Sequence, residues 1–309
     1  MKGAKGARSA KGAKSATGSQ GCQGDGAAQP TVRLALRRAP STESSRGSWA
    51  PLGPLALKAP KAPKALKAPM APHGTLTMTI LIGTSGYNYP EWRGTFYPEK
   101  LSTNKMLAYY AERFPTVEIN YTFYRIPTEK LLTGWAAGTP ENFSFTLKAP
   151  RRITHDSKLQ RCEELLQTFC RTAQTLGPKL ATLLFQLPPT FKKDARVLGE
   201  FVDLLPEGTR AAVEFRHASW FDAETFDTLR RRNIALCVAD SDKLHTPVEV
   251  TAEYGYFRLR DEGYQQADIE RWAQTIRALG LSDVFVYFKH EEQGLGPDFA
   301  RRLIAALDA

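Results

Sequence analysis

The stretch LATLLFQLPPTFKKDARVLGEFVDLLPEGTRAAVEFR, residues 180–216, decides the fold of this chain. It contains two short apolar runs, Leu180–Gln186 and Arg210–Phe215, separated by Lys193–Leu205, a segment with the pattern of a helix. Two prolines close the first run. A strand, a helix and a second strand in succession predict a parallel sheet with helices packed on it.

The same unit repeats along the chain. The eight predicted strands are Thr79–Gly83, Thr116–Asn120, Phe143–Lys148, Leu180–Gln186, Arg210–Phe215, Ile234–Ala239, Tyr254–Leu259 and Asp283–Phe288. Helices are predicted over Asn104–Phe114, from the N-cap Thr128 to Gly138, and over Leu159–Leu176, Lys193–Leu205, Asp222–Arg232, Gln266–Leu279 and from Pro297 onward. Only Asp240–Glu253 lacks a helical pattern between two strands. Eight units favour an α/β fold closed into a single-domain (β/α)8 TIM barrel over an open, doubly wound sheet.

The positive charge of the chain lies in its first quarter. Residues 1–77 carry 13 Lys and Arg against Asp25 and Glu43, whereas residues 78–309 carry 29 basic and 30 acidic side chains. Because the first segment is rich in Ala, Lys, Pro and Gly, we predict a disordered basic tail before a barrel domain over 78–309. The tail is interpreted either as an arm that contacts nucleic acid through its charge or as a segment without a role, with the biological start at Met70 or Met78. No apolar segment follows the early lysines, which argues against a secretory signal, while an organelle transit peptide stays open.

The remaining composition indicates a soluble, cytoplasmic protein. No apolar run approaches the ~18 residues needed to span a membrane. The four cysteines, Cys22, Cys162, Cys170 and Cys237, form no CxxC pair, and the last three fall in predicted helices or strands. Reduced thiols in a packed core are therefore expected.

Polar side chains occupy alternate positions in several of the predicted strands. Such positions share one face of a strand. The pairs at the strand ends are Glu118 and Asn120, Thr146 and Lys148, Thr182 and Gln186, Glu214 and Arg216, and Arg258 and Arg260. Since the outer helices require the apolar face, the polar face should point into the barrel, where its charges must pair or bind a ligand. The predicted network contains Glu118, Lys148, Glu214, Arg216, Asp240 and Arg258.

Several long motifs occur in one order along the body of the chain: IGTSGYNYPEWRGTFYP (82–98), VEINYTFYRIP (117–127), FSFTLKAPRRITHD (143–156), LLFQLPP (183–189), VEFRHASW (213–220) and YFRLR (256–260). The sequence in these motifs resembles the YecE-like family, domain-of-unknown-function family 72. The resemblance implies a TIM-type barrel without an established reaction. The segment FKHEEQGLG (288–296) departs from the family pattern of Phe-Asn-Asn/Asp, so the resemblance assigns no site residue to the last strand.

The barrel mouth, at the C-terminal ends of the strands, is where a site is expected. Predicted catalytic residues are Glu118, Lys148, Glu214 and Asp240, and predicted substrate-binding residues are Asn120, Tyr124, His155, Gln186, Arg216, His217, Arg258 and Arg260. In the leading hypothesis an enzyme holds an anionic, phosphorylated or carboxylated small molecule through Arg216, Arg258 and Arg260. Glu118 or Glu214 is its general base and Lys148 stabilises charge. Lys148 could also form a Schiff base or transfer a proton if burial lowered its pKa, but a neighbouring carboxylate is expected to keep it charged.

Two alternatives remain open. One is a non-catalytic ligand-binding or nucleic-acid-associated protein, with any nucleic acid held through the basic tail. The other is a metal-dependent isomerase or phosphodiesterase, although no HExxH motif or Cys/His cluster occurs and a metal site would need scattered Glu118, Glu214, Asp240 and His217 or His290. GxSxG, GxGxxG and GxxxxGK[ST] are likewise missing, which argues against serine hydrolase, dinucleotide and P-loop chemistry. The sequence assigns no metal, no cofactor and no oligomeric state.

Overall fold

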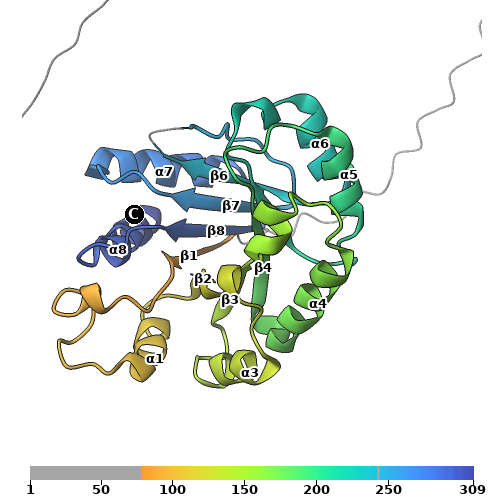
Figure 1. Cartoon of the computed structure of the whole chain (residues 1–309). Coiled ribbons are helices and arrows are strands. Elements are labelled where there is room, and N and C mark those ends of the chain that lie inside the picture. The colour runs from red at the N-terminus through yellow and green to blue at the C-terminus, as the bar shows by residue number, and fades with distance from the viewer. Residues whose placement is uncertain (1–77, 242–243) are drawn as a thin grey trace, which may run out of the picture. The chain divides into compact units, whose positions relative to one another are not determined.

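Eight parallel strands form a closed barrel in a computed structural model of the chain, which describes residues 78–241 and 244–309 (Figure 1). The strands follow each other in sequence order around the barrel, and the first pairs with the last from Thr79↔Asp283 to Thr84↔Phe288. They are β1 (Thr79–Ser85), β2 (Thr116–Ile119), β3 (Ser144–Lys148), β4 (Leu180–Gln186), β5 (Ala211–Glu214), β6 (Ala235–Asp240), β7 (Tyr254–Leu259) and β8 (Asp283–Phe288). The predicted (β/α)8 barrel is confirmed.

Helices surround the strands (Figure 1). They are α1 (Met106–Ala111), α2 (Tyr121–Tyr124), α3 (Glu129–Ala137), α4 (Glu163–Ala173), α5 (Ala195–Asp203), α6 (Ala223–Arg231), α7 (Gln266–Ala278) and α8 (Leu295–Asp308). Side-chain caps fix several starts. Thr128, Asp194 and Asp222 each accept a hydrogen bond from the backbone N–H three residues later, which satisfies a donor that the first helical turn leaves free. The predicted N-cap Thr128 is among them.

Some predicted boundaries are wrong for local reasons. The helix predicted from Leu159 begins at Glu163, because Lys158, Leu159 and Arg161 have positive φ angles, which a right-handed helix excludes. The loop after β3 contains a π-helical turn, Arg152–Asp156, that the sequence analysis did not predict. Helix α2, a single turn after β2, was also not predicted. In the stretch between β6 and β7, the described residues form no helix, as expected.

Two apolar layers result from the alternation within the strands. Outward-facing residues such as Val117, Leu183 and Val213 pack against the helices in the larger cluster. Inside the barrel a second cluster is made of small residues on β5 and β6 and of aromatic residues on β7 and β8, among them Tyr256 and Tyr287. These rings fill the barrel below its C-terminal end. The polar side chains nearer the C-terminal ends of the strands therefore lie on a packed layer of side chains.

Cys162, Cys170 and Cys237 are buried free thiols, as predicted, and burial raises the pKa of each. Cys22 and the basic tail predicted over residues 1–77 lie outside the described residues. None of the helices in the described part of the chain has the length and apolarity needed to cross a membrane.

Candidate functional site

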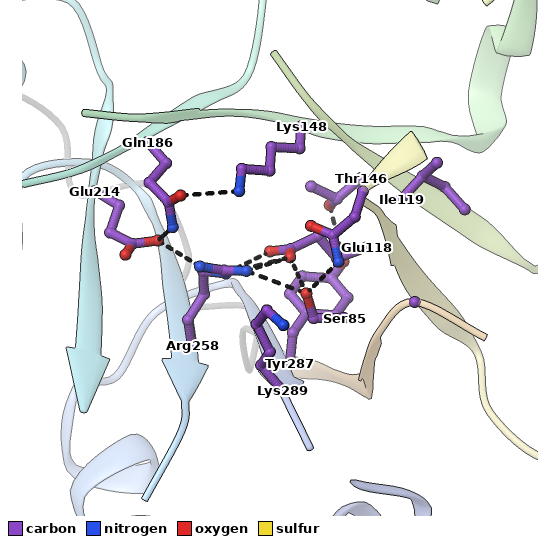
Figure 2. Close-up of polar contacts among 12 residues, drawn as sticks. Ser85, Glu118, Ile119, Thr146, Lys148, Gln186, Glu214, Arg258, Tyr287 and Lys289 are labelled. Atoms are coloured by element: carbon purple, nitrogen blue, oxygen red, sulfur yellow. Dashed lines mark hydrogen bonds and ion pairs between the residues drawn. The ribbon is translucent and has the colours of Figure 1, made fainter. Parts of the chain in front are cut away.

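Arg258, on β7, is the centre of a polar network inside the barrel. Its side chain is 0% exposed, although it carries a full positive charge. Figure 2 shows it between the carboxylates of Glu118 and Glu214, which come from opposite sides. Nη1 donates to Glu214 Oε2 at 2.6 Å and Nη2 donates to Glu118 Oε1 at 2.8 Å. The two ion pairs neutralise charges that would otherwise be too costly to bury.

Glu118, at the end of β2, has both carboxylate oxygens occupied. Arg258 Nε donates to Oε2 at 2.9 Å, and the Tyr256 hydroxyl donates to the same oxygen at 2.6 Å. The Ser85 hydroxyl donates to Oε1. Ser85 Oγ also accepts from Arg258 Nη2 at 3.1 Å and from Asn120 Nδ2 at 2.9 Å. Glu118 is therefore a fixed structural anion without an oxygen free for substrate.

Glu214, at the end of β5, begins the second branch of the network. Gln186 Nε2 donates to Glu214 Oε2 at 2.7 Å, and Gln186 Oε1 accepts from Lys148 Nζ at 2.8 Å (Figure 2). Glu214 Oε1 is buried and has no hydrogen-bond partner among the described residues. Arg216 Nε lies 3.8 Å from it. One carboxylate oxygen of the network is thus left without a hydrogen bond.

The surroundings set the protonation of these groups. Burial raises the pKa of both glutamates, but the Arg258 guanidinium and the hydrogen bonds outweigh burial, so that the pKa of Glu118 is lowered and that of Glu214 falls to about 2. Burial and the nearby Arg258 charge lower the pKa of Lys148 to about 8. Both carboxylates are anionic at neutral pH, while Lys148 is poised to lose its proton just above it.

The contacts of Lys148 differ from the expectation that a carboxylate lies beside it. Within the described ranges it forms no ion pair, because Gln186 stands between its amine and Glu214. Its amine also lies 4.3 Å from the centre of the Phe123 ring, a cation–π contact. Only 7% of Lys148 is exposed, so the amine is held in one place at the end of β3.

More positive charges surround the mouth. Arg216 and Arg260 follow Glu214 and Arg258 on the inward-facing parity of their strands, and about a third of the Arg216 side chain is exposed. Burial lowers the pKa of Arg260, the Glu214 charge raises it, and the charges of Arg258 and Arg216 lower it further. Lys289, after β8, pairs with Glu291 at 2.5 Å. Its charge helps to lower the pKa of Lys148.

Asp240 and Tyr124 are predicted site residues that lie outside the network. Asp240 was predicted to belong to it, but Asp240 Oδ2 accepts from the Tyr264 hydroxyl at 2.6 Å and Oδ1 lies 3.6 Å from His245 Nδ1. Asp240 has the opposite parity to the inward-facing Ala239 and pairs in register with Leu259, an outer-core residue, so its carboxylate points away from the barrel axis. Tyr124 is 81% exposed on α2 and makes no polar contact with the network.

The two predicted histidines are positioned by their own loops. His155 lies in the π-helical turn, with its ring 5.0 Å from that of Phe123 and its Nδ1 2.9 Å from Thr154 Oγ1. Burial and the Lys148 charge lower its pKa, so it is neutral near pH 7. His217 caps a short turn by accepting from the backbone N–H of Ser219 at 3.1 Å. Both are near the mouth, outside the buried network.

Ser85 and Tyr256 are members of the network that sequence reasoning did not identify. Tyr256 stands two residues before Arg258 and therefore shares its face, a signal that strand alternation contains. Ser85 was missed because β1 was predicted to end at Gly83, whereas it continues to Ser85. Extending β1 by two residues brings the Ser85 hydroxyl beside Glu118.

A pocket of about 430 Å³ opens next to the mouth, between the loop after β1, the end of β2 and α3. Its walls include Tyr87, Tyr89, Tyr121 and Trp135. Asn120 lines the pocket and also donates to Ser85 in the network, so that pocket and network adjoin.

The predicted metal donors are not assembled. Glu118 and Glu214 bind Arg258, Asp240 binds Tyr264, and His290 Nε2 lies 2.7 Å from the Asp261 carbonyl oxygen. Over residues 78–241 and 244–309, no three His, Cys, Asp or Glu side chains are grouped in a way that could hold a metal ion.

Comparison with known proteins agrees with this architecture. Residues 81–309 match the family described as "Protein of unknown function DUF72". The chain is 31% identical over 172 residues to the UPF0759 protein YecE of Escherichia coli K12, an alignment covering 54% of this chain and 61% of that protein. It is 26% identical to the UPF0759 protein YunF of Bacillus subtilis over 274 residues, which cover 74% of this chain and 95% of YunF.

Solved structures give the same result. A DUF72 family protein from Thermotoga maritima is 27% identical, with a TM-score of 0.65 over 75% of this chain and 100% of the other. A DUF72 family protein from Enterococcus faecalis shares the fold at 19% identity, with a TM-score of 0.64 over 75% of this chain and 96% of that one. These matches confirm the resemblance read from the motifs. Since the family match extends over nearly the whole barrel, the chain belongs to the DUF72 family of proteins of unknown function.

Proposed function

We propose that this protein is an enzyme that acts on an anionic small molecule, phosphorylated or carboxylated, at the mouth of the barrel. The observation that carries the proposal is the combination of a buried amine with a pKa of about 8, that of Lys148, and an excess of positive over negative charge around it. Glu118 and Glu214 supply two negative charges, whereas Lys148, Arg216, Arg258 and Arg260 supply four positive charges. The site therefore has an excess of two positive charges, which suits a carboxylate or a phosphate dianion.

Arg216 and Arg260 would hold the anion. They follow strands β5 and β7 and have the exposure that Arg258 lacks. The sequence hypothesis included Arg258 in this clamp, but its three nitrogens all bind Glu118, Glu214 or Ser85 inside the barrel. Arg258 therefore supports the site from beneath.

Lys148 would exchange a proton with the substrate or stabilise negative charge that develops on it. A general acid or base works best with a pKa near the working pH, and the pKa of Lys148 is about 8. Glu118 and Glu214 are poor general bases by the same criterion, because their pKa values are lowered. We assign them the role of fixing Arg258 and, through Gln186, the position of the Lys148 amine.

Calorimetric titration and product analysis of the full chain test the proposal together. Inorganic phosphate and a panel of phosphorylated and carboxylated sugars would be titrated, and the same mixtures would be followed by NMR. Arg260→Gln should weaken binding of phosphate compounds about tenfold or more, because a hydrogen bond to a charged group is lost. Lys148→Met should lose turnover and should still bind anions through Arg216 and Arg260, with the lower affinity expected of a site without the Lys148 charge. If no anion binds, the proposal is wrong.

A non-catalytic binding protein is the second candidate, and one observation favours it. Both buried carboxylates are tied to Arg258 and have lowered pKa values, so neither is suited to act as a general base at neutral pH. Anion binding that depends on Arg260, together with no turnover of any compound in the panel, would select this function over the enzyme.

A further inference from the structure

The pocket beside the mouth differs in chemistry from the mouth itself. None of its lining residues carries a charge, and four of them are aromatic: Tyr87, Tyr89, Tyr121 and Trp135. Ile119 and Leu131 add apolar surface between them. The positive charges of the site are on β3 and β7 and directly after β5, β7 and β8, whereas this pocket is built from the β1 loop, β2, α2 and α3. A ligand that fits both must have one charged and one uncharged part.

The walls of the pocket are held by contacts behind them. The Tyr89 hydroxyl donates to the Ser85 carbonyl oxygen at 2.8 Å, and its ring packs 4.8 Å from that of Trp92. Trp135 stacks on Phe145 with ring centres 6.1 Å apart and an angle of 20° between the planes. These aromatic walls are fixed before a ligand arrives, which lowers the entropic cost of binding. Tyr121, on the rim, is 46% exposed and free to lie against a ligand.

Asn120 joins the pocket to the network. Its Nδ2 donates to Ser85, while its Oδ1 is buried without a hydrogen-bond partner among the described residues. A buried acceptor without a partner is unfavourable, so an N–H group from a ligand would stabilise this site. An aliphatic group in the pocket would leave that oxygen unpaired.

We infer that the pocket binds a flat heteroaromatic ring of the substrate whose anionic group is held by Arg216 and Arg260. This inference rests on the proposed function and narrows its substrate class to nucleotide-like anions. Aromatic side chains stack on the faces of such rings, and a volume of about 430 Å³ has room for one. The sugar or other linker would cross the mouth above Lys148.

Calorimetric titration of the full chain with four probes separates the two parts of the site. AMP and CMP carry a ring and a phosphate, ribose 5-phosphate carries only the phosphate, and adenosine carries only the ring. The nucleotides should bind about tenfold or more tightly than ribose 5-phosphate, the contribution expected from one stacked base. Adenosine should bind more weakly than AMP.

Two tyrosines of the same helix form a matched pair of variants. Tyr121→Ala removes a wall of the pocket and should weaken AMP and CMP binding about tenfold without changing the affinity for ribose 5-phosphate. Tyr124→Ala, on a side chain that is 81% exposed and does not line the pocket, should change neither. Arg260→Gln should weaken binding of AMP and ribose 5-phosphate by the same factor.

The outcomes distinguish failure of the inference from failure of the proposed function. Equal affinity for ribose 5-phosphate and the nucleotides would overturn the ring pocket and leave the anion site standing. The ring pocket would also be overturned if Tyr121→Ala lost affinity for ribose 5-phosphate as much as for AMP. The same holds if Tyr124→Ala weakened AMP binding and Tyr121→Ala did not. If none of the phosphate compounds binds, the anion site is wrong and the ring pocket falls with it.

Discussion

Replacing Arg258 with methionine should destabilise the barrel more than any exposed charge replacement. Methionine fills a similar volume but leaves Glu118 without a counter-charge and Glu214 with only the Arg216 Nε 3.8 Å away, and these glutamates are 0% and 1% exposed. Removing one partner of a buried ion pair costs about 3–5 kcal/mol. The pKa of Glu214 gives a second measure: a value of about 2 against an ordinary 4.5 corresponds to roughly 3 kcal/mol of stabilisation at neutral pH.

The loss should appear as a lower melting temperature and should depend on pH. For a domain of this size, a loss of 3–5 kcal/mol lowers the melting temperature by about 10 °C. In the wild type the lowered pKa of Glu214 stabilises the fold above pH 4.5, and this contribution is lost as the pH falls toward 2. In Arg258→Met, burial without a cation raises the folded pKa of both glutamates. Protonation of the glutamates at lower pH then removes their unpaired buried charges. The difference in melting temperature between variant and wild type should therefore narrow from pH 8 to pH 5.

Scanning calorimetry of the full chain at both pH values is the assay. Arg196→Met is the control, because Arg196 forms an exposed ion pair with Glu200 at 2.6 Å and should contribute no more than about 0.5 kcal/mol. If Arg258→Met melts within 2 °C of this control (about 1 kcal/mol), or if its deficit does not change with pH, the two glutamates do not depend on Arg258 and the description of the network is wrong.

Two further predictions concern other parts of the barrel. Sulfate affinity should fall as the pH rises from about 7 to 9, because Lys148, with a pKa of about 8, loses its charge over that range; titration calorimetry should show no such decline in Lys148→Met, and a parallel decline there would assign the effect to another group. Tyr287→Phe should lower the free energy of unfolding by about 1–3 kcal/mol in urea, because the Tyr287 hydroxyl lies 2.8 Å from both Thr116 Oγ1 and Thr146 Oγ1, which would lose their buried partner. An unchanged urea midpoint would mean that the threonines pair elsewhere.

The fold and the inner face of the barrel were predictable because they depend on local patterns. Alternation with a period of two placed Glu118, Lys148, Glu214 and Arg258 inside the barrel, and the structure puts each of them there. The same rule, applied to β6, would have placed Asp240 outside. It was instead assigned to the site because it ends a strand, and strand ends alone do not fix the direction of a side chain.

The contacts within the site were less predictable because they depend on the stagger between strands. Gln186 separates Lys148 from Glu214, although all three end neighbouring strands. The distance between Lys148 and Glu214 determines whether Lys148 forms an ion pair or has an amine with a lowered pKa. The residue types alone do not reveal this distance. The aromatic pocket likewise requires the loop after β1 and α3 to be placed side by side, a tertiary arrangement without a periodic signal in sequence.

The position of the network argues that it serves the site as well as the fold. A buried Glu–Arg–Glu cluster is a poor way to stabilise a protein, since well-packed apolar residues of similar volume often do as well or better. Below the network the barrel already uses that solution, with Ala212, Cys237 and Phe285 among its apolar filling. Within the barrel the buried charged side chains, Glu118, Lys148, Glu214 and Arg258, occur only nearer the mouth, and one oxygen of the cluster, Glu214 Oε1, has no hydrogen-bond partner among the described residues. A cluster retained only for packing would not need to extend through Gln186 to a buried amine with a lowered pKa, whereas a site that exchanges a proton with a bound anion would.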